Sequence, residues 1–143
     1  MKFAEPSFTD AELEVIQGAM DTDIAICRNN IHFRASGEHV TSEEMTNIGT
    51  DILTIQKWLR VKSTIAMAGI LSSEDVSNIY DLAEWNLDRL LEVLSDNVVI
   101  VVEELDSEQF SIDRVEKFLK VSEEVQLTLS VMKIAGEWEK NGK

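Results

Sequence analysis

The sequence has few residues that cross-link, break or bend a chain. Cys27 is the only cysteine among 143 residues, which excludes an internal disulfide and a cysteine-based zinc site. One proline and six glycines are too few for a low-complexity or collagen-like chain. No run approaches the roughly 18 apolar residues of a membrane span, and residues 1–10 lack the apolar core of a signal peptide. We therefore expect a reduced, cytoplasmic protein that forms one domain over residues 1–143.

Basic residues are also scarce. Thirteen Lys and Arg stand against 27 Asp and Glu, so the formal net charge is −14 at pH 7. Nucleic acids and anionic membranes attract positive charge, so this balance argues against direct binding to either of them. Apolar residues make up 44% of the chain, which at this length is enough for a hydrophobic core.

Four helix-start signals divide the chain. Each is a Ser or Thr that precedes an apolar run, and in three cases an acid follows three residues later, which is the spacing of a capping box. The caps are Thr9, Thr41, Ser72 and Ser111, and only the last lacks the acid. These signals predict helices over about 10–34, 42–68, 73–105 and 112–139.

Within these segments apolar residues recur at steps of three and four, as in amphipathic helices. We expect an all-α bundle of four helices, most simply connected up-down-up-down. Cys27 lies on the first apolar stripe and is interpreted as a small buried hydrophobe. The predicted core consists of Leu13, Ile16, Met20, Ile24, Ile48, Ile52, Ile55, Leu87, Leu90, Leu94, Val125 and Leu129.

The segment Val98–Val102 is ambiguous. Five β-branched residues in a row favour a strand locally, but a lone strand has no pairing partner elsewhere in the chain. The helical spacing from Leu94 continues through Val98, Val101 and Leu105. We therefore expect the third helix to run to about Leu105, with a break at Asp96 and Asn97 as the alternative.

The sequence shows no arrangement typical of catalysis. It contains no Glu-x-x-His pair for a metal site in a bundle, no Gly-rich phosphate loop and no Gly-x-Ser-x-Gly motif. His32 and His39 are the only histidines, and both lie at or near the first loop, where solvated side chains are expected. We predict no catalytic residue, no bound metal and no cofactor, and we do not expect an enzyme.

The most distinctive pattern is a row of acids on the third helix. Five carboxylates follow one another at steps of 3, 4, 4 and 4, and therefore share one helix face. Trp85 falls among them, and an exposed tryptophan inside a charged face is typical of an interaction anchor. The plain alternative is a solvated face with Trp85 packed on a neighbouring helix. The predicted partner-binding residues are Asp81, Glu84, Trp85, Asp88, Glu92 and Asp96.

One short basic segment on the second helix is a candidate second contact. It could meet the acidic face of another copy, giving a homodimer, or neutralise that face within the fold. Helices that are apolar on two sides, as the second and fourth are, also suit a dimer interface. The residues of this segment are Lys57, Trp58, Arg60, Val61 and Lys62.

These patterns favour a small acidic protein-binding protein. Carboxylates spaced about 6 Å apart along a helix form a charge row on the scale of a nucleic-acid backbone. The first hypothesis is therefore an inhibitor that masks a basic, nucleic-acid-binding surface of a partner protein, with the bulk character of immunity or phage anti-defence proteins. The alternative is a helical adaptor or oligomeric structural protein whose acids only confer solubility.

Overall fold

The computed structural model describes residues 8–37, 39–106 and 112–142, and within these ranges it contains four helices and no strand. The helices are α1 (Asp10–Ala35), α2 (Ser42–Ala66), α3 (Ser73–Asp106) and α4 (Ile112–Gly142). This confirms the all-α class and the four-helix bundle. Val98–Val102 lies inside α3, so the helical interpretation of that segment is also confirmed.

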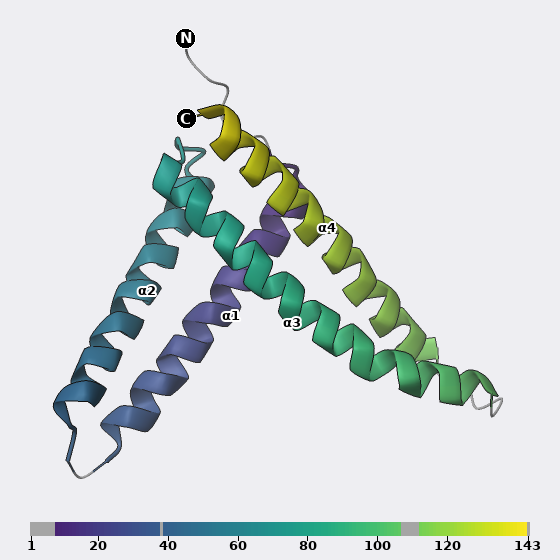
Figure 1. The fold of residues 1–143 in the computed structure, drawn as a ribbon, viewed down its shortest axis with the longest axis horizontal. Helices are drawn as coiled ribbons and strands as arrows, with labels where there is room; N and C mark the ends of the chain where they lie inside the picture. Colours follow the sequence, from purple (N-terminus) through teal and green to yellow (C-terminus); the bar gives the residue numbers. More distant parts are fainter. Residues whose placement is uncertain (1–7, 38, 107–111, 143) are drawn as a thin grey trace.

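The helices form two antiparallel hairpins that cross and then diverge (Figure 1). α1 packs along α2 and α3 packs along α4, while α1 also contacts both helices of the second hairpin. The chain runs up and down in turn, and α2 passes into α3 at the end where the hairpins meet. Away from this junction each hairpin continues as a separate two-helix arm (Figure 1). The first arm extends to the end of α1 and the start of α2, and the second to the end of α3 and the start of α4.

The core lies at the junction, where all four helices contribute. Met20 of α1, Val61 of α2, Ile79 of α3 and Val131 of α4 are each at most 1% exposed. Leu13 and Ile55 are half-buried and pack against this core. Leu87 is half-buried, and so are Ile48 and Leu94 farther along the arms, where side chains have fewer neighbours.

Two predicted core residues are wrong. Ile52 is 43% exposed and Leu129 is 44% exposed. α2 packs into the core through Trp58 and Val61, which turns the side of the helix that carries Ile52 toward solvent. The predicted core assumed a bundle closed along its whole length, whereas the arms diverge.

The helix-start signals act as the sequence predicts. Thr9 and Glu12 form a complete capping box, with the Thr9 N–H donating to Glu12 Oε1 at 2.8 Å and the Glu12 N–H to Thr9 Oγ1 at 3.2 Å. Ser72 and Asp75 form the same pair of bonds ahead of α3, both at 3.1 Å. Thr41 caps α2, while Ser111 lies outside the described residues.

The end of α2 differs from the expectation. The helix stops at Ala66, and Ala68 takes the left-handed conformation, with φ of 52°. Its N–H donates to the Ile65 carbonyl at 3.0 Å, and the Gly69 N–H donates to the Thr64 carbonyl at 2.8 Å. These two bonds define a Schellman motif, in which glycine is the usual residue at the left-handed position. Here alanine occupies that position.

Ala68→Gly is expected to stabilise the protein by about 0.5–1 kcal/mol, because glycine adopts a positive φ without the steric penalty of a Cβ. Gly69→Ala is the matched control and should destabilise, since a Cβ there would lie 3.1 Å from Thr64 Cγ2 and 3.3 Å from the Thr64 carbonyl oxygen. Urea unfolding followed by circular dichroism measures both changes. If Ala68→Gly lowers the free energy of unfolding, the left-handed conformation is not a source of strain.

Candidate protein-binding surface

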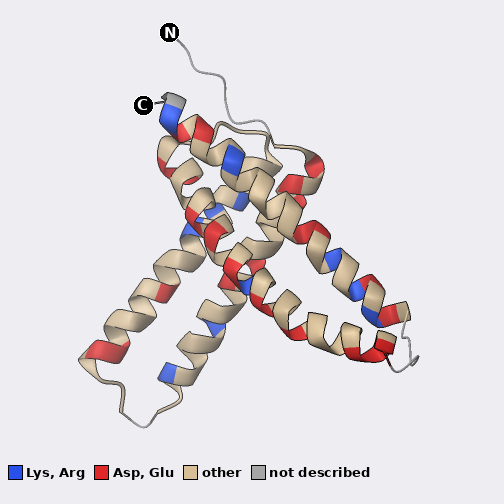
Figure 2. Ribbon diagram, turned by 45° about the vertical axis from the view of Figure 1, so that its right-hand side comes forward, with Lys and Arg blue, Asp and Glu red and all other residues tan. Residues whose placement is uncertain are grey.

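The five carboxylates of α3 are all exposed: Asp81, Glu84, Asp88, Glu92 and Asp96. We call this set the acidic face. Figure 2 shows acidic positions recurring along α3, while the basic positions of the same hairpin lie mainly on its other helix. Within the described ranges, no Lys or Arg forms an ion pair with any member of the face. Their mutual repulsion, about 0.2–0.5 kcal/mol for each i,i+4 pair, is therefore not offset locally.

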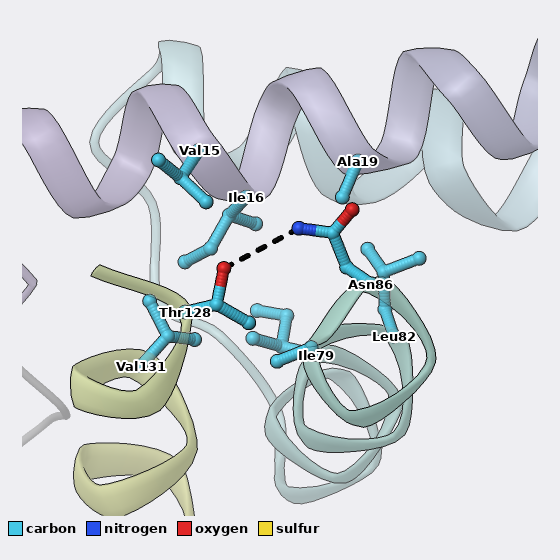
Figure 3. A pocket seen from close by; sticks show the side chains of 9 residues that line it. Val15, Ile16, Ala19, Ile79, Leu82, Asn86, Thr128 and Val131 are labelled. Atoms are coloured by element: carbon cyan, nitrogen blue, oxygen red, sulfur yellow. Dashed lines mark hydrogen bonds between the residues drawn. The ribbon is translucent and has the colours of Figure 1, made fainter. Parts of the chain in front are cut away.

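Arg89 is the one base on α3, and its guanidinium contacts Asn86 and Trp85. Its Nη2 donates to the Asn86 side-chain oxygen at 2.7 Å, and its guanidinium carbon lies 5.7 Å from the centre of the Trp85 ring. Asn86 is 3% exposed and donates to Thr128 Oγ1 on α4 at 3.3 Å (Figure 3). A buried amide thus positions Arg89 beside Trp85, and among the described residues Arg89 forms no ion pair with the acidic face.

Trp85 is 37% exposed and lines a cleft of about 230 Å³ between three helices. The cleft is lined by Asp23, Lys57, Trp58, Asn78, Asp81, Leu82 and Trp85. Members of both predicted patches therefore meet in one place, since Lys57 and Trp58 come from α2 whereas Asp81 and Trp85 come from α3. This arrangement places a partly exposed aromatic ring, that of Trp85, among the carboxylates of the acidic face.

The predicted second contact is wrong for Trp58 and Val61. Trp58 is 3% exposed and Val61 is fully buried, so both belong to the core. The Trp58 indole Nε1 donates to Asp23 Oδ2 on α1 at 2.7 Å, and Lys57 Nζ lies 4.3 Å from the centre of the ring. Trp58 and Val61 belong to the core because the side of α2 that carries them packs against the other helices at the junction.

The two remaining bases of that segment are engaged within the chain. Arg60 binds Asp75 through two N–H donors, at 2.8 and 3.4 Å, and Lys62 forms an ion pair with Asp21. These pairs stabilise the junction between α1, α2 and the start of α3. They do not touch the acidic face, so neutralisation of that face within the fold is not observed in the described part of the chain.

The other chemically active side chains are not grouped. His32 and His39 are exposed at the far end of the first hairpin. Cys27 is 5% exposed, and burial together with the nearby Asp23 and Asp51 raises the pKa of its thiol to about 11. Nowhere among the described residues do three or more His, Cys, Asp or Glu lie close enough to hold a metal ion. The described helices also include none that is long and apolar enough to cross a membrane.

A second cleft, of about 460 Å³, lies between α1, α3 and α4. Its charged lining is mixed, with Glu14, Glu123 and Glu124 facing Arg89 and Lys120. Both clefts touch the segment 81–89 of α3, which is therefore open on two sides.

Comparisons with protein-family models, with curated proteins and with solved structures each find no match to this chain. The interpretation of the surface therefore depends on its own geometry.

Sequence reasoning missed Asp23, Asn78, Leu82 and Asn86. Asp23 approaches Trp85 only through tertiary packing, which no local pattern announces, whereas Asn78 precedes Trp85 by two turns on the same side of α3. Asn86 did carry a signal, because it occupies a core position of α3, four residues after Leu82 and four before Leu90. A polar residue at such a position indicates a buried hydrogen bond.

Proposed function

We propose that the protein binds a basic surface of a partner protein through the acidic face and the Trp85 cleft, and thereby keeps nucleic acid from that surface. The observation that supports this most is the exposed row of carboxylates, to which the described part of the chain supplies no ion-pairing base, with a partly exposed tryptophan in its midst. Such a row raises the self-repulsion of α3, so helix stability does not account for it. The charges orient the encounter, and Trp85 supplies apolar contact.

The exposed apolar residues of the arms support a second candidate, a helical adaptor or oligomeric structural protein. Ile26, Phe33, Met45 and Leu53 are exposed on the first hairpin, and Val98, Val99 and Val102 on the second. Binding through these residues would depend little on salt, whereas binding through the acidic face would weaken steeply as salt is added.

The test compares charge reversal on and off the acidic face. The wild-type chain is used to capture proteins from its source cell at low salt, and the affinity of the captured partner is then measured. Asp88→Lys with Glu92→Lys is expected to weaken this affinity more than about tenfold. Glu116→Lys with Glu137→Lys is the control, because it changes the net charge equally at two exposed positions of α4.

The salt dependence of binding, measured for the wild type and for Trp85→Ala, gives a second readout. Trp85→Ala should weaken binding with little change in its salt dependence, since it removes apolar contact only. The reversed protein should stay folded or become slightly more stable, because the i,i+4 repulsion is relieved. If both charge-reversed proteins bind the partner as tightly as the wild type, the acidic face is a solvated surface and the second candidate takes its place.

A further inference from the structure

α2 carries an apolar row that nothing in the described chain covers. Met45, Ile52 and Leu59 follow one another at steps of seven residues, so they lie along one side of the helix. They are 57%, 43% and 47% exposed. Ile48 and Ile55 continue the same stripe and are half-buried. We call these five residues the α2 row. It extends over about 21 Å, at 1.5 Å per residue.

The charge of α2 also sets it apart. Its three acids, Glu43, Glu44 and Asp51, are balanced by three bases, so the helix is neutral in a chain of net charge −14. α3 has ten acids and one base, a net charge of −9. A second copy of the chain can approach α2 without the repulsion that it meets at α3, although α3 also has exposed apolar residues.

The order of the charges along α2 favours one relative orientation of two packed copies of this helix. Its acids occupy the half that begins at Ser42, and its bases, Lys57, Arg60 and Lys62, occupy the half that ends at Ala66. Two parallel copies would place like charges side by side, whereas two antiparallel copies place the acidic half of each against the basic half of the other. Arg60 and Lys62 pair with Asp75 and Asp21 within the chain, but their side chains stay 56% and 31% exposed beside those pairs. Antiparallel packing of identical helices has two-fold symmetry, the commonest symmetry of homodimers.

From these observations we infer that the protein forms a two-fold dimer in which the α2 row of one copy packs antiparallel on the α2 row of a second copy. Ile52 lies at the centre. Seven residues to either side, Met45 lies opposite the partner's Leu59. The contact leaves the acidic faces of both copies open, because they are on α3, so this inference is independent of the proposed function.

The first experiment is sedimentation of the wild-type chain and two variants over a range of concentrations. The wild type should sediment at twice the 16.1 kDa of one chain. Ile52→Asp should raise the dissociation constant at least about tenfold, because it places two carboxylates at the centre of the contact. Leu129→Asp should leave it unchanged. It is a matched control, since Leu129 is 44% exposed and Ile52 43%, but Leu129 lies on α4.

A cross-linking experiment tests the geometry without a destabilising charge. Ile52→Cys places two thiols at the two-fold centre, so mild oxidation should link the copies rapidly. Leu53→Cys is the control and should not link the copies. Leu53 is 66% exposed, but its side chain points about 100° around the helix from that of Ile52. Cys27, at 5% exposure, does not compete. A monomeric wild type at about 100 μM, a dimer that survives Ile52→Asp, or equal linking by both cysteines would overturn the inference and leave the α2 row to another partner.

Discussion

Trp58→Ala is expected to remove about 3–5 kcal/mol from the free energy of unfolding, the range for deleting a buried tryptophan. Trp58 is 3% exposed and belongs to the core cluster with Met20, Val61 and Ile79, so no other side chain fills its place. The substitution also leaves Asp23 without the indole donor at 2.7 Å. Trp58→Phe keeps most of the ring and should cost only about 1 kcal/mol for the lost hydrogen bond.

Trp85→Ala is the control within the same chain. Trp85 is 37% exposed, and its removal should cost about 1–2 kcal/mol in apolar burial. Urea unfolding followed by far-ultraviolet circular dichroism separates the two, and it does not depend on tryptophan fluorescence. If the two alanine variants lose the same stability, the junction does not depend on Trp58 as described.

Arg60→Ala is expected to cost about 2–3 kcal/mol, even though the arginine side chain itself is 56% exposed. The reason is the partner, because Asp75 is 2% exposed and would keep its charge in the core without the two guanidinium donors. Asp75→Asn should cost less, since the arginine left behind can turn to water. The double variant should recover part of the stability that Arg60→Ala loses, as the double-mutant cycle would show.

The pH dependence of this loss has a definite sign. Burial alone would raise the pKa of Asp75, but the Arg60 hydrogen bonds and the Ser72 cap outweigh it and hold the pKa below its ordinary value of 3.8. The stabilisation is therefore complete above that value and is lost as the pH falls through the lower, folded-state pKa. Without Arg60 only the Ser72 hydrogen bonds oppose the effect of burial, so the pKa of the Asp75 carboxyl is higher than in the wild type and it protonates more readily. The difference between wild type and Arg60→Ala should be large at pH 7 and shrink at pH 3; a constant difference would contradict this account.

The helices were predictable from the sequence because their signals are local. A capping residue, an acid three residues later and apolar steps of three and four all lie within one turn or two of each other, so Thr9 and Ser72 could be recognised without knowing the fold. Ala68 shows the limit of this reasoning, since the left-handed residue that follows α2 is an alanine, although a glycine stands next to it at position 69. The identities of Ala68 and Gly69 alone do not show which of them takes the left-handed conformation. The two hydrogen bonds of the Schellman motif show that it is Ala68.

The faces of the helices were predictable only where the bundle is closed. Ile16, Met20 and Ile24 lie on the apolar stripe of α1 and are buried, because α1 meets all three other helices at the junction. The apolar stripe of α2 is equally regular in the sequence, yet Ile52 is exposed and Trp58 is buried. Periodicity finds the apolar side of a helix, but the angle at which two hairpins cross decides which part of that side is covered.

On the candidate surface, too, helix periodicity does not show which side chain is covered, as Trp85 and Trp58 illustrate. Trp85 lies on α3 among acids, and the structure leaves it partly exposed beside Arg89. Trp58 had an equally polar neighbour in Lys57, but its indole nitrogen is held by Asp23, which is 35 residues away in sequence. Long-range partners of this kind are invisible to any pattern confined to one helix.

The divergence of the hairpins also determines how the molecule opens. Only the junction is enclosed by four helices, so the resistance to unfolding is concentrated around Met20, Val61, Ile79 and Val131. Toward the ends of the arms each helix is supported by one neighbour, and local opening there exposes little surface that was not exposed already. We therefore expect the ends of the arms to fray at a free energy below that of unfolding the whole chain, which hydrogen exchange would measure.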